Sequence, residues 1–211
     1  RRAAYLALLL EYPQTLNQVA RLCSTSPWVS DYLSQHPVLL DELLDVRTLH
    51  AAPDRSKAQA ELRELLDSAA GDTERQMDIL RHFKQAQIFR LVAQDLAGIL
   101  PLERLSDHLS DLADMILDET LRLCWLGLRV RHCDQPRFAI IGYGKLGGKE
   151  IGYASDLDII FLYDDDAQEA AEVYAKLGQR MNTWLTSLTP AGMLYDTDLR
   201  LRPNGASGLL V

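Results

Sequence analysis

Residues 137–163 read RFAIIGYGKLGGKEIGYASDLDIIFLY, and this stretch decides the fold. Residues 137–141 and 156–163 form two apolar runs of strand length, and a cluster of glycines lies between them. Acidic, apolar and acidic residues follow one another at Asp156, Leu157 and Asp158, so the two carboxylates share one face of the second strand. Like charges side by side repel each other unless a divalent cation binds both, and carboxylate oxygens suit Mg²⁺. The stretch therefore predicts two strands that carry glycines and paired carboxylates to one site.

The glycine cluster fits more than one phosphate-binding template. Residues 142–147 form a GxGxxG pattern after a strand, and Asp164 lies where a ribose-binding acid of a dinucleotide fold is expected. A parallel crossover, however, needs about 10 residues including its helix. Only seven residues separate Gly148 from Asp156, which disfavours that fold. A P-loop ending at Lys149 would require glycine at the position of Tyr143, so that template fails.

The third template is that of the nucleotidyltransferase superfamily that includes DNA polymerase beta. Its apolar-Gly-Gly element matches residues 146–148, and its acid-apolar-acid strand matches residues 156–159. Gly147 and Gly148 would let the backbone approach a triphosphate closely. A third strand expected over Met193–Leu201 would add Asp198 and so complete a two-metal site. The alternative interpretation of that strand is a solvated face on which acids and arginines pair.

The rest of the chain predicts an α+β architecture with two domains. Apolar residues recur at helical spacing through residues 1–134, which indicates an N-terminal helical bundle, and one helix is expected from Ala167 to about Leu188. Residues 135–211 are expected to form a catalytic core with a small mixed sheet, apparently truncated at its C-terminus. Residues 164–166 (three aspartates) are interpreted as a solvated turn.

Composition narrows the functional classes. The 211 residues carry a formal net charge of −8, which argues against a general nucleic-acid binder. No apolar run of about 18 residues exists, so no membrane span is expected. The three cysteines lack CxxC spacing and indicate free thiols in a reducing cytoplasm. The five histidines are scattered and give no zinc pattern.

Three strings together resemble one family, the bacterial glutamine synthetase adenylyltransferases. They are IGYGKLGGKE at 141–150, SDLDIIF at 155–161 and DLRLRP at 198–203, and the similarity extends through Gly205–Gly208 and into the helical region at Ser26-Pro27-Trp28. Members carry two nucleotidyltransferase halves: one adds AMP to a tyrosine of glutamine synthetase, and the other removes it with phosphate. The string at 143–148 with Gly152-Tyr153 resembles the adding half, and the removing half is the main rival.

The resemblance implies a specific site and specific partners. Two Mg²⁺ ions, with Mn²⁺ as a substitute, would be held by Asp156, Asp158 and Asp198, and ATP would be the substrate. The residues expected to contact its phosphates are Gly147, Gly148, Lys145, Arg200 and Arg202. Ser155 would either contact the triphosphate or cap the turn before the strand. Implied partners are glutamine synthetase, a PII-type signalling protein and glutamine, in the cytoplasm. A nucleotide-sensing domain without catalysis is the alternative from another functional class.

Overall fold

The structure, a computed structural model, describes residues 2–200, and the chain divides into two compact units. The first unit runs to Asp54 and includes His82–Leu105, and the second joins Arg55–Arg81 to the chain from Ser106 onward. The domain division at residue 135 remains a prediction. The compact units follow a different division, because two long segments of the expected helical region group with the strands.

The first unit is helical. Gln94 is almost fully buried, and its side-chain amide donates to the carbonyls of Leu49 and Ala51, both at 3.1 Å. This hydrogen bonding ties the end of a short helix to a long one. Pro27 opens its helix at the first position, where its missing N–H costs nothing. The elements of this unit are α1 (Arg2–Glu11), α2 (Pro13–Thr25), α3 (Pro27–Gln35), the 3-10 helix η1 (Pro37–Leu43), α4 (Val46–Leu49) and the later part of α6 (Thr73–Leu96).

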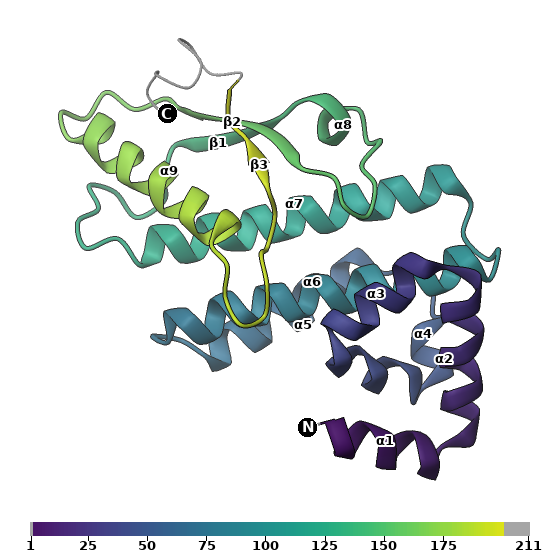
Figure 1. Cartoon of the computed structure of the whole chain (residues 1–211). Helices are drawn as coiled ribbons and strands as arrows, with labels where there is room; N and C mark the ends of the chain where they lie inside the picture. Colours follow the sequence, from purple (N-terminus) through teal and green to yellow (C-terminus); the bar gives the residue numbers. More distant parts are fainter. Residues whose placement is uncertain (1, 201–211) are drawn as a thin grey trace. The chain divides into compact units, whose positions relative to one another are not determined.

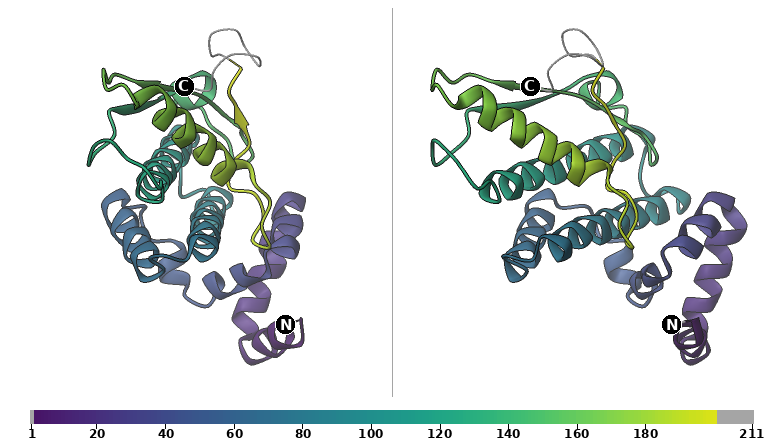
Figure 2. Two further views of the ribbon diagram at one scale, coloured as in Figure 1. Left: turned by 90° about the vertical axis from the view of Figure 1, so that its left-hand side faces the viewer. Right: turned by 60° about the vertical axis from the view of Figure 1, so that its left-hand side comes forward.

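The second unit packs helices against a three-stranded mixed sheet, which confirms the predicted α+β class. In Figures 1 and 2, α7 and α9 lie on the same face of the sheet. The helices of this unit are α5 (Arg55–Ser68), the first part of α6, α7 (Leu102–Leu126), the single turn α8 (Gly144–Gly147) and α9 (Ala170–Thr186). The strands are β1 (Phe138–Gly142), β2 (Leu157–Tyr163) and β3 (Thr197–Asp198).

Strand pairing explains why the stretch at 137–163 decides the fold. β1 pairs with β2 antiparallel, from Phe138 opposite Tyr163 to Gly142 opposite Ile159. An antiparallel neighbour cannot be the next strand of a parallel crossover. The pairing therefore excludes the dinucleotide-binding template for the glycine cluster. β2 pairs with β3 in parallel, and the helix α9 makes the connection that a parallel pair requires.

Tyr174 of α9 is the centre of the core beneath the sheet. Its side chain is fully buried, and its ring stacks on Trp125 of α7 and Tyr163 of β2, with ring centroids 5.9 and 4.9 Å away. Phe138 of β1 lies 5.8 Å from it in a tilted arrangement. Along β2, alternate residues are buried, beginning with Leu157. The helices therefore hold one face of the sheet and leave the intervening residues on the other face.

The third strand is shorter than predicted. Instead of Met193–Leu201, only Thr197–Asp198 pairs in the described part of the chain, and Leu201 lies outside the described residues. The N–H groups of Leu194 and Tyr195 both donate to the carbonyl of Leu185 at the end of α9, and both side chains are buried. The alternating sequence pattern was therefore misleading, because the backbone before Asp196 bonds to a helix end rather than to a neighbouring strand.

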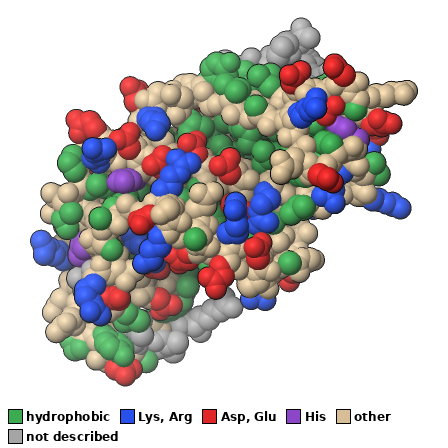
Figure 3. Space-filling model, turned by 180° about the vertical axis from the view of Figure 1, so that it is seen from behind, with side chains coloured by type: hydrophobic (Ala, Val, Ile, Leu, Met, Phe, Trp, Pro, Cys, Tyr) green, Lys and Arg blue, Asp and Glu red, His purple; other side chains and the backbone are tan. Residues whose placement is uncertain are grey.

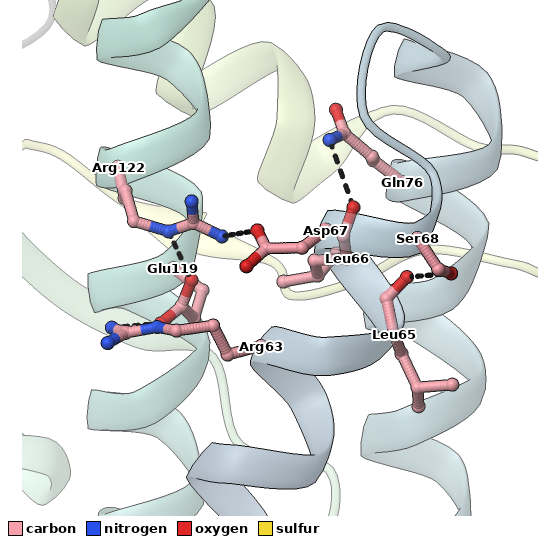
Figure 4. A network of polar contacts seen from close by, with 8 residues as sticks. All are labelled: Arg63, Leu65, Leu66, Asp67, Ser68, Gln76, Glu119 and Arg122. Carbon is pink, nitrogen blue, oxygen red and sulfur yellow. Dashed lines mark hydrogen bonds and ion pairs between the residues drawn. The ribbon is translucent and has the colours of Figure 1, made fainter.

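An ion-pair network joins α5 to α7 (Figure 4). The carboxylate of Glu119 is completely buried, with one oxygen accepting from Arg63 at 2.6 and 3.0 Å and the other from Arg122 at 2.6 Å. Arg122 also reaches Asp67 at 3.1 Å. A buried carboxylate is tolerated only when it is paired and hydrogen-bonded, so the network fixes the two helices together.

Charges of both signs are interspersed over the surface shown in Figure 3, rather than gathered in one basic patch. Among the helices of residues 2–200, none combines the length and the apolar character needed to cross a membrane.

Replacing Arg63 by Met leaves the buried Glu119 with one partner and is expected to lower the free energy of unfolding by about 2 kcal/mol. The matched control is Arg55→Met, which removes an exposed pair between the same two helices, Arg55 with Asp111 at 2.9 Å. That change is expected to cost about 0.5 kcal/mol. Urea denaturation at neutral pH measures both, and equal losses would contradict a special role for the buried carboxylate.

Candidate functional site

The sheet sets two of the predicted aspartates, Asp158 and Asp198, side by side at one end, and Asp156 comes just before β2. Asp158 and Asp198 are register partners in β2 and β3, and partners in adjacent strands project from the same face. The preceding residue of β3, Thr197, donates its hydroxyl to Asn182 of α9 at 2.9 Å, so Thr197 faces the helices and Asp198 faces away from them. Asp156 lies two residues before Asp158 and is exposed.

Arg200 neutralises this acidic site. Its backbone N–H and its guanidinium both donate to the Asp198 carboxylate, at 2.9 Å for the N–H and at 2.9 and 3.0 Å for Nε. These bonds lower the pKa of Asp198 to about 2. The hydrogen bonds to Asp198 also raise the pKa of Arg200, and the negative charges of Asp198, Asp158 and Asp156 add to that rise. An oxygen of the neighbouring Asp196 accepts the N–H of Thr197.

The glycine segment forms one wall of the site. Gly144 has a φ of +50°, and a Cβ built on it would lie 2.3 Å from Oδ2 of Asp158. Only glycine therefore fits at this position beside the carboxylate. The N–H of Tyr143 donates to the Asp158 carbonyl at 2.8 Å. Asp158 is thus held against the turn α8 that follows β1.

The two glycines predicted to face triphosphate differ in their surroundings. A Cβ on Gly147 would lie 2.6 Å from the carbonyl oxygen of Gly142. The close packing of α8 on β1 therefore explains why this position has no side chain. Gly148 is exposed, and a Cβ on it would meet its nearest atom, the Gly144 oxygen, at 3.3 Å. Both glycines are exposed, and Gly148 has the looser surroundings of the two.

The remaining predicted residues lie around the same loop. The hydroxyl of Ser155 accepts the N–H of Gly152 at 2.9 Å, which is the turn-capping role that the sequence offered as one of two possibilities. Lys145 is exposed on α8. Arg202 lies outside the described residues.

The donor set fits a hard divalent cation, because every predicted ligand is a carboxylate oxygen. In this structure a guanidinium occupies the place of a cation beside Asp198. A metal held by all three aspartates requires Arg200 to leave Asp198, which would free Arg200 for an anionic group such as a phosphate. The arrangement can therefore bind either its own arginine or a metal with a phosphate ligand.

Within residues 2–200, the set of side chains that places three potential metal ligands within 4.8 Å of one another is His132, Cys133 and Asp165; Asp156, Asp158 and Asp198 do not come that close together. Sequence reasoning missed it, because His132 and Cys133 come from the loop before β1 and Asp165 from the turn after β2. Asp165 was predicted to be solvated, and this was wrong. One of its oxygens accepts from His132 at 2.8 Å and from Tyr174 at 2.9 Å, and the other accepts the Ala167 N–H at 3.0 Å.

These contacts are those of a structural network rather than a metal site. The Cys133 thiol donates to the carbonyl of Gln135, and all the Asp165 contacts come from protein donors. Metal-binding histidines usually donate their second ring N–H to a partner, whereas the buried Nδ1 of His132 has none among the described residues. The network anchors the loop before β1 to the turn after β2.

Comparison with known proteins identifies the family. Residues 16–211 match the sequence model for glutamate-ammonia ligase adenylyltransferase. The chain belongs to this family.

Curated members of the family match the chain from end to end. A protein of Chromobacterium violaceum is 64% identical over 211 residues, and one of Aromatoleum aromaticum is 60% identical over 211 residues; each match covers 100% of this chain. A protein of Nitrosomonas europaea is 61% identical over 212 residues, covering 99% of this chain. Each is named a bifunctional glutamine synthetase adenylyltransferase/adenylyl-removing enzyme. The chain spans only 24%, 22% and 23% of these relatives, respectively.

Substituting Gly147 by Ala forces a Cβ against a backbone oxygen and is expected to lower stability by roughly 1–3 kcal/mol. Gly152→Ala is the matched control, because its Cβ would meet nothing closer than the Ser155 hydroxyl at 3.6 Å. The control should change stability by less than about 0.5 kcal/mol. Thermal unfolding compares the two, and a tolerated Gly147→Ala would contradict the tight packing of α8 on β1.

Asp165→Asn is expected to destabilise the chain in a pH-dependent way. The hydrogen bonds from His132, Ala167 and Tyr174 lower the folded-state pKa of Asp165 to about 2. A lowered pKa contributes stability above the unfolded value near 4, and that contribution is lost as pH falls through the folded value. The difference in melting temperature between wild type and Asp165→Asn should therefore shrink from about pH 4 towards about pH 2.

The exposed Asp166→Asn serves as the control for the acid titration. A wild-type advantage over Asp165→Asn that stayed constant down to pH 2 would show that ionisation of Asp165 does not stabilise the network.

Proposed function

We propose that this chain carries the site that transfers AMP from Mg²⁺-ATP to a tyrosine hydroxyl of glutamine synthetase, with release of pyrophosphate. The observation that carries the proposal is the parallel register of β2 and β3, which sets Asp158 beside Asp198 at the end of the strand that Asp156 precedes. Membership of the adenylyltransferase family supports the same chemistry.

The proposed roles of the residues combine the family resemblance with the positions of the side chains. Asp156, Asp158 and Asp198 would hold two Mg²⁺ ions through carboxylate oxygens. Bound metal would lower the pKa of the attacking hydroxyl and neutralise charge on the triphosphate. The exposed Gly148 would let the backbone approach the triphosphate, and Gly147 and Gly144 allow the turn to pack against β1 and Asp158. Arg200, released from Asp198, would pair with phosphate oxygens, and the exposed Lys145 would add positive charge there. Arg202, which lies outside the described residues, is proposed for the same role.

The protein substrate and the regulators come from the family. The relatives' names specify glutamine synthetase as the protein that is adenylylated, and we extend this to the present chain. Regulation by a PII-type protein and by glutamine belongs to the same proposal. The free cysteines fit a reducing cytoplasm as the location.

The relatives' names also include an adenylyl-removing activity, so the chain has to be assigned to one of two activities. We assign it to the adding half on the resemblance of the strings at 143–148 and 152–153. The removing half would use the same carboxylates to direct phosphate rather than a hydroxyl at the adenylyl group, and the experiments must separate the two.

The first test is calorimetry of the chain with ATP in the presence of Mg²⁺ or Mn²⁺. Asp156→Asn combined with Asp158→Asn should weaken metal-dependent ATP binding by tenfold or more, because about that much follows from disturbing a metal's ligand shell. The matched control is Asp164→Asn with Asp166→Asn, two exposed acids with the same spacing at the other end of β2. Unchanged binding by the first variant, or loss of binding by both, would contradict the proposed site.

A second test assigns the half. In the full-length protein, Asp158→Asn should abolish transfer of labelled AMP from ATP to glutamine synthetase and leave phosphate-dependent removal in place. The opposite outcome, with transfer retained and removal lost, would place this chain in the removing half.

A further inference from the structure

The position of Asp198 is set from outside the sheet. β3 consists of two residues, and the ten residues between α9 and β3 make no ladder with β2 apart from the Leu157 N–H bonding to the Asp196 carbonyl at 3.0 Å. Such a short strand needs other contacts to hold it in register. Some of those contacts come from α9, through Leu185 and Asn182. Others come from α6, in its part that belongs to the second unit.

Arg81 of α6 has a completely buried side chain that bonds to carbonyl groups of this connection. Its Nε donates to the carbonyl of Gly192 at 2.7 Å, and its Nη2 donates to the carbonyls of Ser187 at 2.7 Å and Trp184 at 3.0 Å. Its Nη1 donates to Met77 of its own helix at 2.8 Å. Burial lowers the pKa of Arg81, yet a guanidinium stays charged in proteins, so these carbonyls satisfy a buried cation.

A second residue of α6, Asp78, also binds the turn 189–192. Residues 78 and 81 are neighbours on the helix surface. The Asp78 carboxylate accepts the Thr189 hydroxyl at 2.7 Å, and that hydroxyl accepts the Ala191 N–H at 3.1 Å. Thr189 and Gly192 also bond to each other through their backbones, at 2.9 and 3.1 Å. Both ends of the turn 189–192 are therefore attached to α6, six residues before Asp198.

The chemistry of these contacts is specific to arginine. Three of the carbonyls that Arg81 binds belong to the end of α9 and the turn after it, and they converge on one planar group. Lysine would supply a single ammonium on a flexible stem and could not reproduce the fork of donors. A change from Arg to Lys at this position should therefore leave carbonyls unpaired and let the turn shift.

We propose that Arg81 is a positioning residue for the carboxylate site: by fixing the turn 189–192 it sets the register of β3 and so the distance of Asp198 from Asp158. This inference rests on the proposed function, because it assumes that the aspartates bind metal together. It makes α6 a support of the carboxylate site, on which Arg81 acts through the turn 189–192.

The test measures Mn²⁺ binding to the chain by electron paramagnetic resonance, with and without ATP. Arg81→Lys should weaken Mn²⁺ binding about tenfold or more, the usual effect of losing the support behind a metal ligand. Arg63→Met is the control, since it removes an ion pair of the buried Glu119 in the same unit without touching the turn. It should bind Mn²⁺ as wild type does, with circular dichroism confirming that each variant is folded at the temperature used.

The outcomes separate this inference from the proposed function. Wild-type Mn²⁺ binding that Asp156→Asn with Asp158→Asn does not weaken overturns the proposed site, and the role of Arg81 with it. A folded Arg81→Lys variant with wild-type affinity overturns the role of Arg81 alone. If Arg81→Lys does not fold, Thr189→Val decides, because it removes the Asp78 contact from the turn side at nearly constant volume; unchanged affinity in that variant also overturns the proposal.

Discussion

The parallel pairing of β2 with β3 is the constraint on which the site depends. Two parallel strands cannot be joined by a tight turn, so the chain must leave the sheet after Tyr163, run back through α9 and return beside β2. The buried face of α9 packs in the core of the unit, and the hydroxyl of Thr197 in β3 donates a hydrogen bond to Asn182 of the helix. This hydrogen bond helps to fix the register of β3. A shift by one residue would turn Asp198 towards the helices and Thr197 outward. The paired carboxylates are thus a consequence of how the connection is packed.

Electrostatics explain why the site is stable before any ligand binds. Three carboxylates at one end of a sheet repel one another, and the guanidinium of Arg200 offsets that repulsion by pairing with Asp198. The same side chain is suited to phosphate once a metal replaces it at the aspartates. Close packing of the glycine segment adds rigidity, since Gly144 lies against Asp158 and Gly147 against Gly142. The negative charge of this site can therefore be balanced in two ways, by the guanidinium of Arg200 or by a bound metal.

Much of this was readable from the sequence, and the failures have physical causes. Periodicity and spacing were sufficient for the α+β class and for β1 and β2, because these depend on residues close together in the chain. The extent of β3 was not predictable, because the alternating pattern at 193–201 does not reveal that Leu194 and Tyr195 bond to the end of α9. Asp165 resembled a solvated turn residue, since its partners His132 and Tyr174 are distant in sequence. Nothing in the sequence distinguishes Arg81 from other arginines of a long helix, because the turn 189–192 that it binds is distant in the chain.

The most direct measurement is the crystal structure of this chain with Mn²⁺ and a non-hydrolysable ATP analogue, with the metal located from its anomalous scattering. If the aspartates form the metal site, Mn²⁺ lies between Asp156, Asp158 and Asp198, the triphosphate lies along Gly148, and Arg200 has left Asp198 for a phosphate oxygen. A metal and triphosphate bound elsewhere, with the pair of Arg200 and Asp198 intact, would contradict the assignment of the aspartates as the metal site.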